Sequence, residues 1–283
     1  MNRTYLLLDA ALIDDLAQRL LHMKQFALCQ PLYVNTAYET LADCGPMLVD
    51  VTSNRPLQEM FKQQWRTESG IWLESTAKES ELIEHLRSLV HVQLDSGITV
   101  LFRYYDPRIT PLWLNSLQNH ERDLMLGPVQ TIRLPSENGL DLSIFRHGPE
   151  QDAARYSDTP WLTLTSRQLD ILCQAQHQRF DQHLLDHCQR FFPEALEGLG
   201  PDERHQWAQA CRKSAARHGY STDSQVTRWV ALFACLGESF PYGNTHAPYQ
   251  RILEEPFISP EQRLDNLLAE LPRRLIRNME SAV

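Results

Sequence analysis

The chain has 283 residues, of which 42% are hydrophobic and 22% charged, and its formal net charge is −9. This length can bury a large core and favours two domains over one. The negative charge disfavours non-specific binding to nucleic acid or to an anionic membrane, and no stretch approaches the roughly 20 apolar residues that span a bilayer.

Residues 1 to about 147 alternate strand-like and helix-like segments, which is typical of a mixed α/β lobe. Apolar runs predict strands, and segments with helical spacing of apolar residues predict helices. The strands are expected at 5–8, 32–34, 47–51, 71–73 and 98–102, and the helices at 10–26, 57–65, 80–92 and 110–126. After the break at Gly127-Pro128, segments 129–134 and 140–145 are expected to form a hairpin through Glu137-Asn138-Gly139.

The stretch 98–108 joins an apolar run to a charged turn. Residues 98–102 suit a buried strand, and Arg103, Asp106 and Arg108 follow where that strand stops. Asp106 precedes Pro107, which is typical of a helix N-cap. The three charges could form an internal ion-pair cluster, or they could bind a partner. In an enzyme, the alternative class, they would line an anion or substrate pocket.

The remainder of the chain has helical spacing throughout. Capping boxes, in which a Ser or Thr is followed three residues later by Gln, begin at Thr165, Thr222 and Ser259. Pro272 is expected to kink or end the last helix. The predicted fold class is therefore α+β, with an N-terminal mixed α/β lobe at 1–147, a polar linker at 148–164 and an all-α helical lobe at 165–283.

Catalytic motifs are scarce. Ser75-Thr76-Ala77-Lys78 matches the Ser-x-x-Lys pattern of serine acyl-enzymes, but the companion motifs are missing and a solvated loop is the simpler interpretation. Phosphate-binding, dinucleotide-binding and zinc-protease motifs are also absent from the sequence. We therefore expect no catalytic residues and no cofactor.

A metal-binding regulatory protein is a third possibility, because His183 and His187 are four residues apart on one predicted helix. Cys173 and His177 have the same spacing on that helix, but no further ligand cluster lies nearby. A polar helix surface is the simpler interpretation, and no metal is expected.

Three aromatic residues, Tyr242, Tyr249 and Phe257, lie in a loop-rich, proline-containing stretch of the helical lobe. Exposed aromatics there would suit a protein partner, and burial against the helices is the alternative. The six cysteines are scattered, which favours free thiols in a reducing cytosol, and the N-terminal apolar run is too short for a signal peptide. A cytoplasmic protein is expected.

The order of motifs resembles the bacterial type VI secretion effector-adaptor family, whose domain was long catalogued only as one of unknown function. The matching pieces cover roughly the first 130 residues: Tyr5-Leu6-Leu7-Leu8-Asp9-Ala10, Gly45-Pro46-Met47-Leu48-Val49, His85-Leu86-Arg87-Ser88-Leu89, Leu101-Phe102-Arg103-Tyr104-Tyr105-Asp106-Pro107-Arg108 and Leu126-Gly127-Pro128-Val129. Less distinctive matches occur in the helical lobe, at 215–220 and 235–240.

The resemblance implies a cytoplasmic, non-catalytic chaperone that binds a toxin effector and promotes its loading onto the VgrG spike. It supplies no catalytic, cofactor or metal residues. The candidate partner-binding residues are Arg103, Tyr104, Asp106 and Arg108 in the first lobe and Tyr242, Tyr249 and Phe257 in the second. Which lobe would bind the effector and which the spike stays open.

Overall fold

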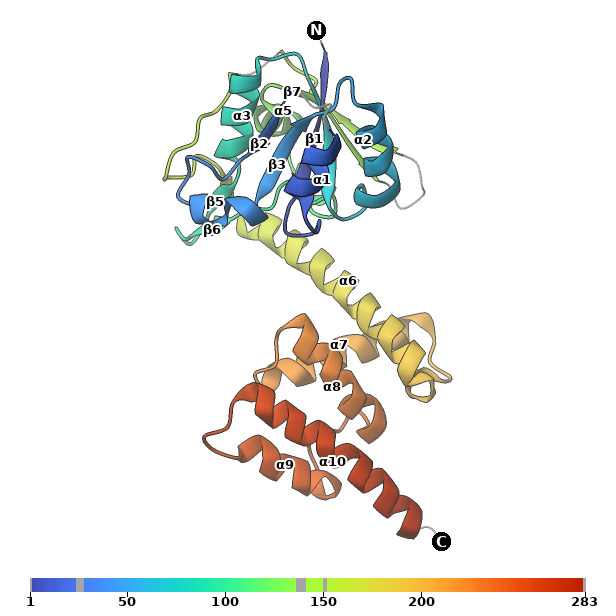
Figure 1. The fold of residues 1–283 in the computed structure, drawn as a ribbon. Coiled ribbons are helices and arrows are strands. Elements are labelled where there is room, and N and C mark those ends of the chain that lie inside the picture. The colour runs from blue at the N-terminus through green and yellow to red at the C-terminus, as the bar shows by residue number, and fades with distance from the viewer. Residues whose placement is uncertain (1, 24–27, 136–140, 150–151, 282–283) are drawn as a thin grey trace. The chain divides into compact units, whose positions relative to one another are not determined.

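A computed structural model describes residues 2–23, 28–135, 141–149 and 152–281 (Figure 1). The chain divides into two compact units, residues 1–172 and 173–283. The first unit contains β1 (Arg3–Asp9), α1 (Leu16–Met23), β2 (Cys29–Pro31), η1 (Glu39–Cys44), β3 (Pro46–Asp50), α2 (Arg55–Met60), η2 (Phe61–Trp65), β4 (Gly70–Ser75), α3 (Glu79–Ser88), β5 (His91–Leu94), β6 (Thr99–Leu101), α4 (Thr110–Asn115), α5 (Asn119–Leu126), β7 (Val129–Pro135), β8 (Asp141–Phe145) and β9 (Thr163–Leu164).

The second unit is helical. It contains η3 (Pro193–Leu196), α7 (Pro201–Arg217), α8 (Asp223–Leu236), η4 (Asn244–His246), α9 (Ala247–Glu254) and α10 (Pro260–Ser281), and the division between the units falls inside α6 (Ser166–Phe191). A mixed α+β first part followed by an all-helical part confirms the predicted fold class. Among the helices that the structure describes, none combines the length and the apolar character that a membrane crossing requires.

A six-stranded antiparallel sheet organises the first unit, in the order β2-β3-β1-β4-β7-β8. Alternate residues of the central strand β1 point to opposite faces of the sheet, and both faces are buried. Leu6 and Leu8 pack with residues of α1, α2 and η2, while Tyr5 and Leu7 share a core with residues of α3, α4 and α5. Helices therefore cover both faces of the sheet around β1 (Figure 1).

The predicted hairpin is confirmed, because β7 and β8 pair antiparallel with Ile132 opposite Ile144. Its expected turn residues, Glu137-Asn138-Gly139, lie outside the described residues. β8 is one edge of the sheet, and β2 is the other.

The expected buried strand at 98–102 is wrong. β6 has only three residues, lies at the edge of a second, three-stranded sheet in the order β6-β5-β9, and leaves Leu101 exposed. The predicted helix 80–92 was also too long, because α3 ends at Ser88 and β5 begins at His91. The buried side chains of Val90 and Val92 extended the apolar pattern into a segment that pairs with β6 instead.

Two further predicted helices are shorter in the structure. The helix expected at 10–26 begins only at Leu16, because the Asp9 carboxylate accepts a hydrogen bond from the Ala11 N–H at 3.0 Å and holds a turn. The helix expected at 110–126 is two helices, and the Arg122 guanidinium donates to the Leu114 carbonyl at 3.0 Å where they meet. The strand expected at 32–34 is also wrong, since β2 ends at Pro31 and turns follow.

Part of the expected linker packs against the first unit. β9 pairs with β5 in parallel, the Ala154 N–H donates to His85 Nδ1 at 3.2 Å, and the Trp161 indole N–H donates to Ser88 Oγ at 3.0 Å. The division at 172/173 therefore lies downstream of the predicted boundary. Whether the two units fold separately stays a prediction.

The second unit is built around buried aromatic side chains. Trp229, Tyr220 and Phe240 are fully buried and in ring contact. The capping box predicted at Thr222 is present, since Gln225 and Thr222 exchange hydrogen bonds at the start of α8. At the predicted box of α10, the Gln262 N–H donates to Ser259 Oγ at 3.1 Å. The last helix continues through Pro272, so of the two predicted effects of this proline, a kink or an end, the end is wrong.

Candidate functional site

The charged turn, residues 103–108, follows β6 and contains two separate ion pairs. The Arg103 guanidinium pairs with the Asp9 carboxylate at the end of β1, and Arg108 binds both oxygens of Asp106 at 2.9 and 2.8 Å. Planar two-point pairing of this kind is among the stronger charge-assisted hydrogen bonds in proteins. The predicted cluster Arg103–Asp106–Arg108 is therefore two ion pairs, Arg103 with Asp9 and Arg108 with Asp106. Asp9 was not among the predicted site residues.

Asp106 caps a turn rather than α4 itself, which corrects the predicted N-cap. Its carboxylate accepts a hydrogen bond from the Arg108 N–H at 2.9 Å, and its carbonyl accepts one from Thr110 N–H, also at 2.9 Å. The Thr110 hydroxyl donates to the carbonyl of Tyr104 at 2.5 Å. The turn is thus fixed from inside before α4 begins at Thr110.

Burial governs the electrostatics beneath this turn. Asp9 is 1% exposed, and its removal from water raises the pKa of its carboxyl, although the Arg103 charge opposes that rise. Burial also raises the pKa of the Tyr105 hydroxyl, which lies 3.3 Å from the Tyr33 hydroxyl. The Arg103 guanidinium carbon lies 5.9 Å from the centroid of the Tyr105 ring. Arg103, which is partly exposed, therefore contacts two buried groups, the Asp9 carboxylate and the Tyr105 ring.

Only part of the charged turn can reach a partner. Tyr104 and Asp106 are buried, and the Tyr104 hydroxyl donates to the Leu86 carbonyl at 2.8 Å. The side chains of Arg103 and Arg108 are 41% and 36% exposed. The structure thus leaves the two guanidinium groups as the surface that this turn offers, and places Tyr104 and Asp106 among the groups that hold it.

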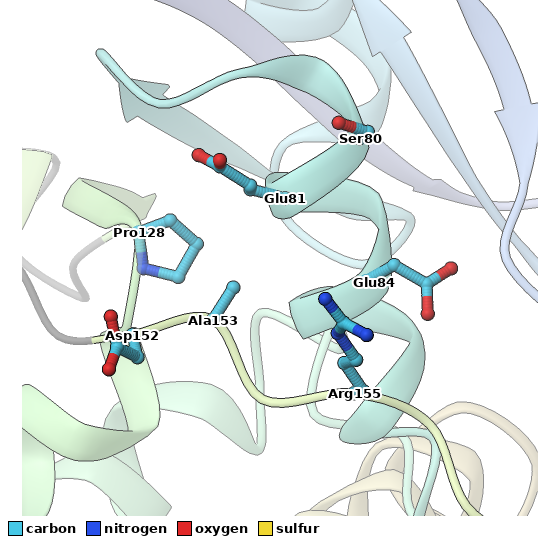
Figure 2. Close-up of a pocket in the computed structure, with 7 residues that line it drawn as sticks. All are labelled: Ser80, Glu81, Glu84, Pro128, Asp152, Ala153 and Arg155. Atoms are coloured by element: carbon cyan, nitrogen blue, oxygen red, sulfur yellow. The ribbon is translucent and has the colours of Figure 1, made fainter.

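The cavity of about 690 Å³ in the first unit lies elsewhere. Figure 2 shows it between α3 and residues 152–155, with Glu81, Glu84, Asp152 and Arg155 among the side chains that line it. Glu84 already pairs with Arg87 at 2.5 Å. The hollow is polar and acidic. Its lining includes none of Arg103, Asp106 and Arg108, the residues that were expected to line the pocket of an enzyme. The charged turn therefore does not line this cavity.

Buried polar side chains of α3 hold the strap, residues 152–162, against the first unit. His85 Nδ1 accepts from the Ala154 N–H, so Nε2 carries the proton and donates to the Met125 carbonyl at 2.8 Å. Burial lowers the pKa of this imidazole, which suits a neutral ring. A protonated His85 would lose its acceptor for Ala154.

We expect the stability of the protein to fall as pH drops below about 6.5, the ordinary pKa of histidine. Because the pKa of His85 is lowered in the folded state, the unfolded chain takes up the proton first, so acid favours unfolding. His85→Gln should lose less stability than wild type between pH 7.5 and 5.5 in urea titrations. His22→Gln, at an exposed position of α1, is the control. Equal losses in wild type and His85→Gln would contradict the prediction.

The three candidate aromatics of the second unit have different surroundings. Tyr249 is fully buried and its ring contacts Phe240, so it belongs to the core. Tyr242 is exposed and its ring lies 5.9 Å from that of His218. Phe257 is fully exposed, in the loop between α9 and α10. Only Tyr242 and Phe257 are thus available to a partner.

The backbone at Phe257 is in the left-handed region, with φ of 66°. Asp15 and Asn35 are the other described residues besides glycine with positive φ, and Asn and Asp tolerate this conformation better than a bulky aromatic. The Arg263 guanidinium fixes the loop by donating to the carbonyls of Glu255 at 3.1 Å and Ile258 at 3.4 Å. A strained, anchored and outward-facing aromatic is a candidate contact residue.

The histidines that suggested a metal lie on α6. His187 is in ring contact with Phe191, at 4.7 Å between centroids. Within the described ranges, no group of three or more His, Cys, Asp or Glu side chains could hold a metal ion. The absence of a metal stays a prediction.

Comparison with known proteins identifies sequence relatives of this chain. Residues 4–124 match the family described as a domain of unknown function (DUF4123). The chain is 25% identical over 242 residues to the protein named accessory protein VasW of Vibrio cholerae serotype O1 (strain ATCC 39315 / El Tor Inaba N16961). This match covers 83% of this chain and 76% of that protein. No solved structure matches the chain. The resemblance to the type VI secretion effector-adaptor family is confirmed, and these matches support a role associated with type VI secretion.

Sequence reasoning missed Asp9, the buried partner of Arg103. A signal was present, because Asp9 follows the apolar run 5–8 as Arg103 follows 98–102. The pairing itself joins residues 94 positions apart, and local patterns carry no information about such a contact. The strain at Phe257 was equally invisible, since nothing in its neighbours requires a positive φ.

Proposed function

We propose that this chain is a non-catalytic adaptor of type VI secretion. In this proposal it acts in the cytoplasm, binds a toxin effector and promotes loading of that effector onto the VgrG spike, without a cofactor. The observation that carries the proposal is the match of residues 4–124 to the DUF4123 family, together with similarity to the accessory protein VasW that extends through most of the chain.

The distribution of exposed anchors supports two binding surfaces. Arg103 and Arg108 present guanidinium groups in the first unit, and Tyr242 and Phe257 present aromatic rings in the second. Arginine and large aromatics are the residue types that most often dominate the energy of protein interfaces. One surface for each partner is the simplest assignment, and Asp106 and Tyr104 would act by holding the first surface in place.

The adaptor should form stoichiometric complexes with its partners. We expect the full chain, co-expressed with a candidate toxin effector and a VgrG spike protein from its own genome, to co-purify with each at a fixed ratio in size-exclusion chromatography with light scattering. Arg108→Ala should weaken capture of one partner by about tenfold, about the loss of one interface contact of 1.4 kcal/mol. It keeps the Asp106 carboxylate bonded to the backbone N–H of residue 108.

The control is a melting curve of Arg108→Ala, because loss of this guanidinium leaves the buried Asp106 carboxylate with its backbone hydrogen bond alone. Capture is therefore compared at temperatures where both the variant and wild type are folded. Failure of the full chain to capture either candidate partner would sink the proposal. So would secretion that is fully restored by amounts of the protein far below those of the effector, since that result indicates turnover.

A further inference from the structure

A second recognition feature lies on the six-stranded sheet, away from the charged turn. The η2 groove is a hollow of about 270 Å³ between η2 and the end of β7. Its lining includes Phe61, Lys62, Arg66, Trp72, Arg133 and Pro135. Pockets for small molecules usually begin at about 300 Å³, so this hollow is sized for an inserted side chain rather than for a cofactor.

The floor of the groove is aromatic. The rings of Phe61 and Trp72 lie 6.1 Å apart between centroids, at 52° to each other. Trp72 on β4 faces Arg133 on β7, and Arg133 faces Ser143 on β8. Phe145, two residues further along β8, therefore shares this face of the sheet, and it is 53% exposed. An exposed aromatic side chain therefore lies on the same face of the sheet as the groove, on the edge strand β8.

The helix beside the groove has an unusual backbone. Residues Phe61–Trp65 form a π-helical turn, and the Arg66 N–H donates to the Phe61 carbonyl at 2.9 Å, five residues back. Such turns are rare, are inserted into α-helices and are frequently found at functional sites. Here the turn carries Phe61 and Lys62, and Arg66 follows it directly. It is an observation independent of the cavity.

Positive charge surrounds the aromatic floor. Lys62, Arg66 and Arg133 all line the groove, in a chain whose net charge is −9. The Lys62 ammonium lies 5.9 Å from the centroid of the Trp72 ring and 2.8 Å from the Glu59 carboxylate. Arg133 pairs with Glu74 at 2.5 Å and remains 47% exposed. Lys62 and Arg133 thus each form an ion pair with a carboxylate and keep a partly exposed side chain.

We propose that the η2 groove binds a short acidic peptide segment of a protein partner. One aromatic side chain of that segment would occupy the hollow over Phe61 and Trp72, and its flanking carboxylates would pair with Lys62 and Arg133. The aromatic floor selects the anchor, and the cations select the sign of the flanking charge. This inference rests on the proposed function only in taking the natural partner to be a protein.

The test uses the full-length protein and synthetic peptides, so it does not depend on capture of an effector. A fluorescein-labelled peptide Gly-Glu-Glu-Phe-Glu-Glu-Gly is titrated in fluorescence anisotropy, beside versions with lysine in place of glutamate and with alanine in place of phenylalanine. We expect saturable binding of the acidic aromatic peptide, weakened at least tenfold by either change to the peptide. Raised salt should weaken it further.

Matched variants locate the site. Arg133→Gln and Lys62→Gln should each weaken binding at least fivefold. Arg3→Gln should leave binding unchanged, because Arg3 on β1 forms a similar ion pair, with Glu79 of α3, but does not line the groove. Circular dichroism melts confirm that each variant is folded. Absence of saturable binding, equal binding of the lysine or alanine peptide, or equal weakening by Arg3→Gln would each overturn the proposal. If millimolar inorganic phosphate displaced the acidic aromatic peptide and the alanine peptide equally well, the groove would be a plain anion site, and the proposal would also be overturned.

Discussion

Replacing Arg103 with methionine should lower the free energy of unfolding by about 2 kcal/mol, because it leaves the buried Asp9 carboxylate without its cation. A fully buried pair would lose about 3–5 kcal/mol, but the Arg103 side chain is 41% exposed and solvent screens part of the interaction. Urea titrations at pH 7 measure the change. Arg3→Met, which removes a pairing with a more exposed carboxylate, should change stability little.

The pH dependence identifies the cause of this loss. Burial raises the pKa of Asp9 in the folded state, and removal of Arg103 raises it further. A carboxyl whose folded pKa lies above its unfolded value is destabilising at high pH and less so as pH falls through the folded pKa. The deficit of Arg103→Met should therefore shrink between pH 7 and pH 5, and Asp9→Asn combined with it should recover part of the loss. A deficit that is independent of pH would contradict the ion-pair explanation.

The same variant separates the two interpretations of the charged turn. If Arg103 only stabilises the turn, partner capture per folded molecule should match wild type at temperatures where Arg103→Met is folded. If its exposed guanidinium also contacts a partner, capture should fall at those temperatures as well. Arg108 provides the comparison, because its partner Asp106 keeps a hydrogen bond from the backbone N–H of residue 108 when the guanidinium is removed.

Features set by neighbouring residues could be predicted from the sequence. The capping box at Thr222 joins residues three positions apart, so its spacing alone predicted the start of α8. Strand boundaries were less accessible. Val90 and Val92 continue the apolar spacing of α3, and only pairing of β5 with β6 and β9 determines that the helix ends before them and that Val92 belongs to a strand. Pairing between distant segments is a tertiary property that a local pattern does not contain.

The motifs that resemble the adaptor family could be recognised in the sequence, but the contacts that their residues make could not be predicted from it. His85 and Gly127 belong to separate motifs, and the structure brings them together. A Cβ at Gly127 would collide with the His85 ring, and the φ of 50° at this position also favours glycine. Ser88, of the His85 motif, receives the Trp161 indole. These two motifs therefore hold the strap and the turn after α5 in place, whereas the guanidinium groups of Arg103 and Arg108 are partly exposed and stay candidates for recognition.

Replacing Phe257 with glycine should stabilise the protein and weaken partner capture, two effects of opposite sign. Glycine adopts a φ of 66° without steric cost, and the fully exposed ring makes no packing that the change would remove. The free energy of unfolding should rise by up to about 1 kcal/mol. If the ring is an interface anchor, its loss costs about 2 kcal/mol of binding, which corresponds to roughly 30-fold weaker capture.

A matched control comes from Phe191, which is also exposed in the second unit but lies at the end of α6. Phe191→Ala should leave capture close to wild type. Phe257→Asn gives a second variant that tolerates the left-handed backbone, and it should weaken capture as glycine does. Chemical denaturation measures the first effect, and titration of the co-purifying partner measures the second. A Phe257→Gly protein that is more stable and binds both partners as wild type does would show that the strain at Phe257 serves no interface, whereas the expected pair of results shows that the fold retains a conformational cost to present this ring.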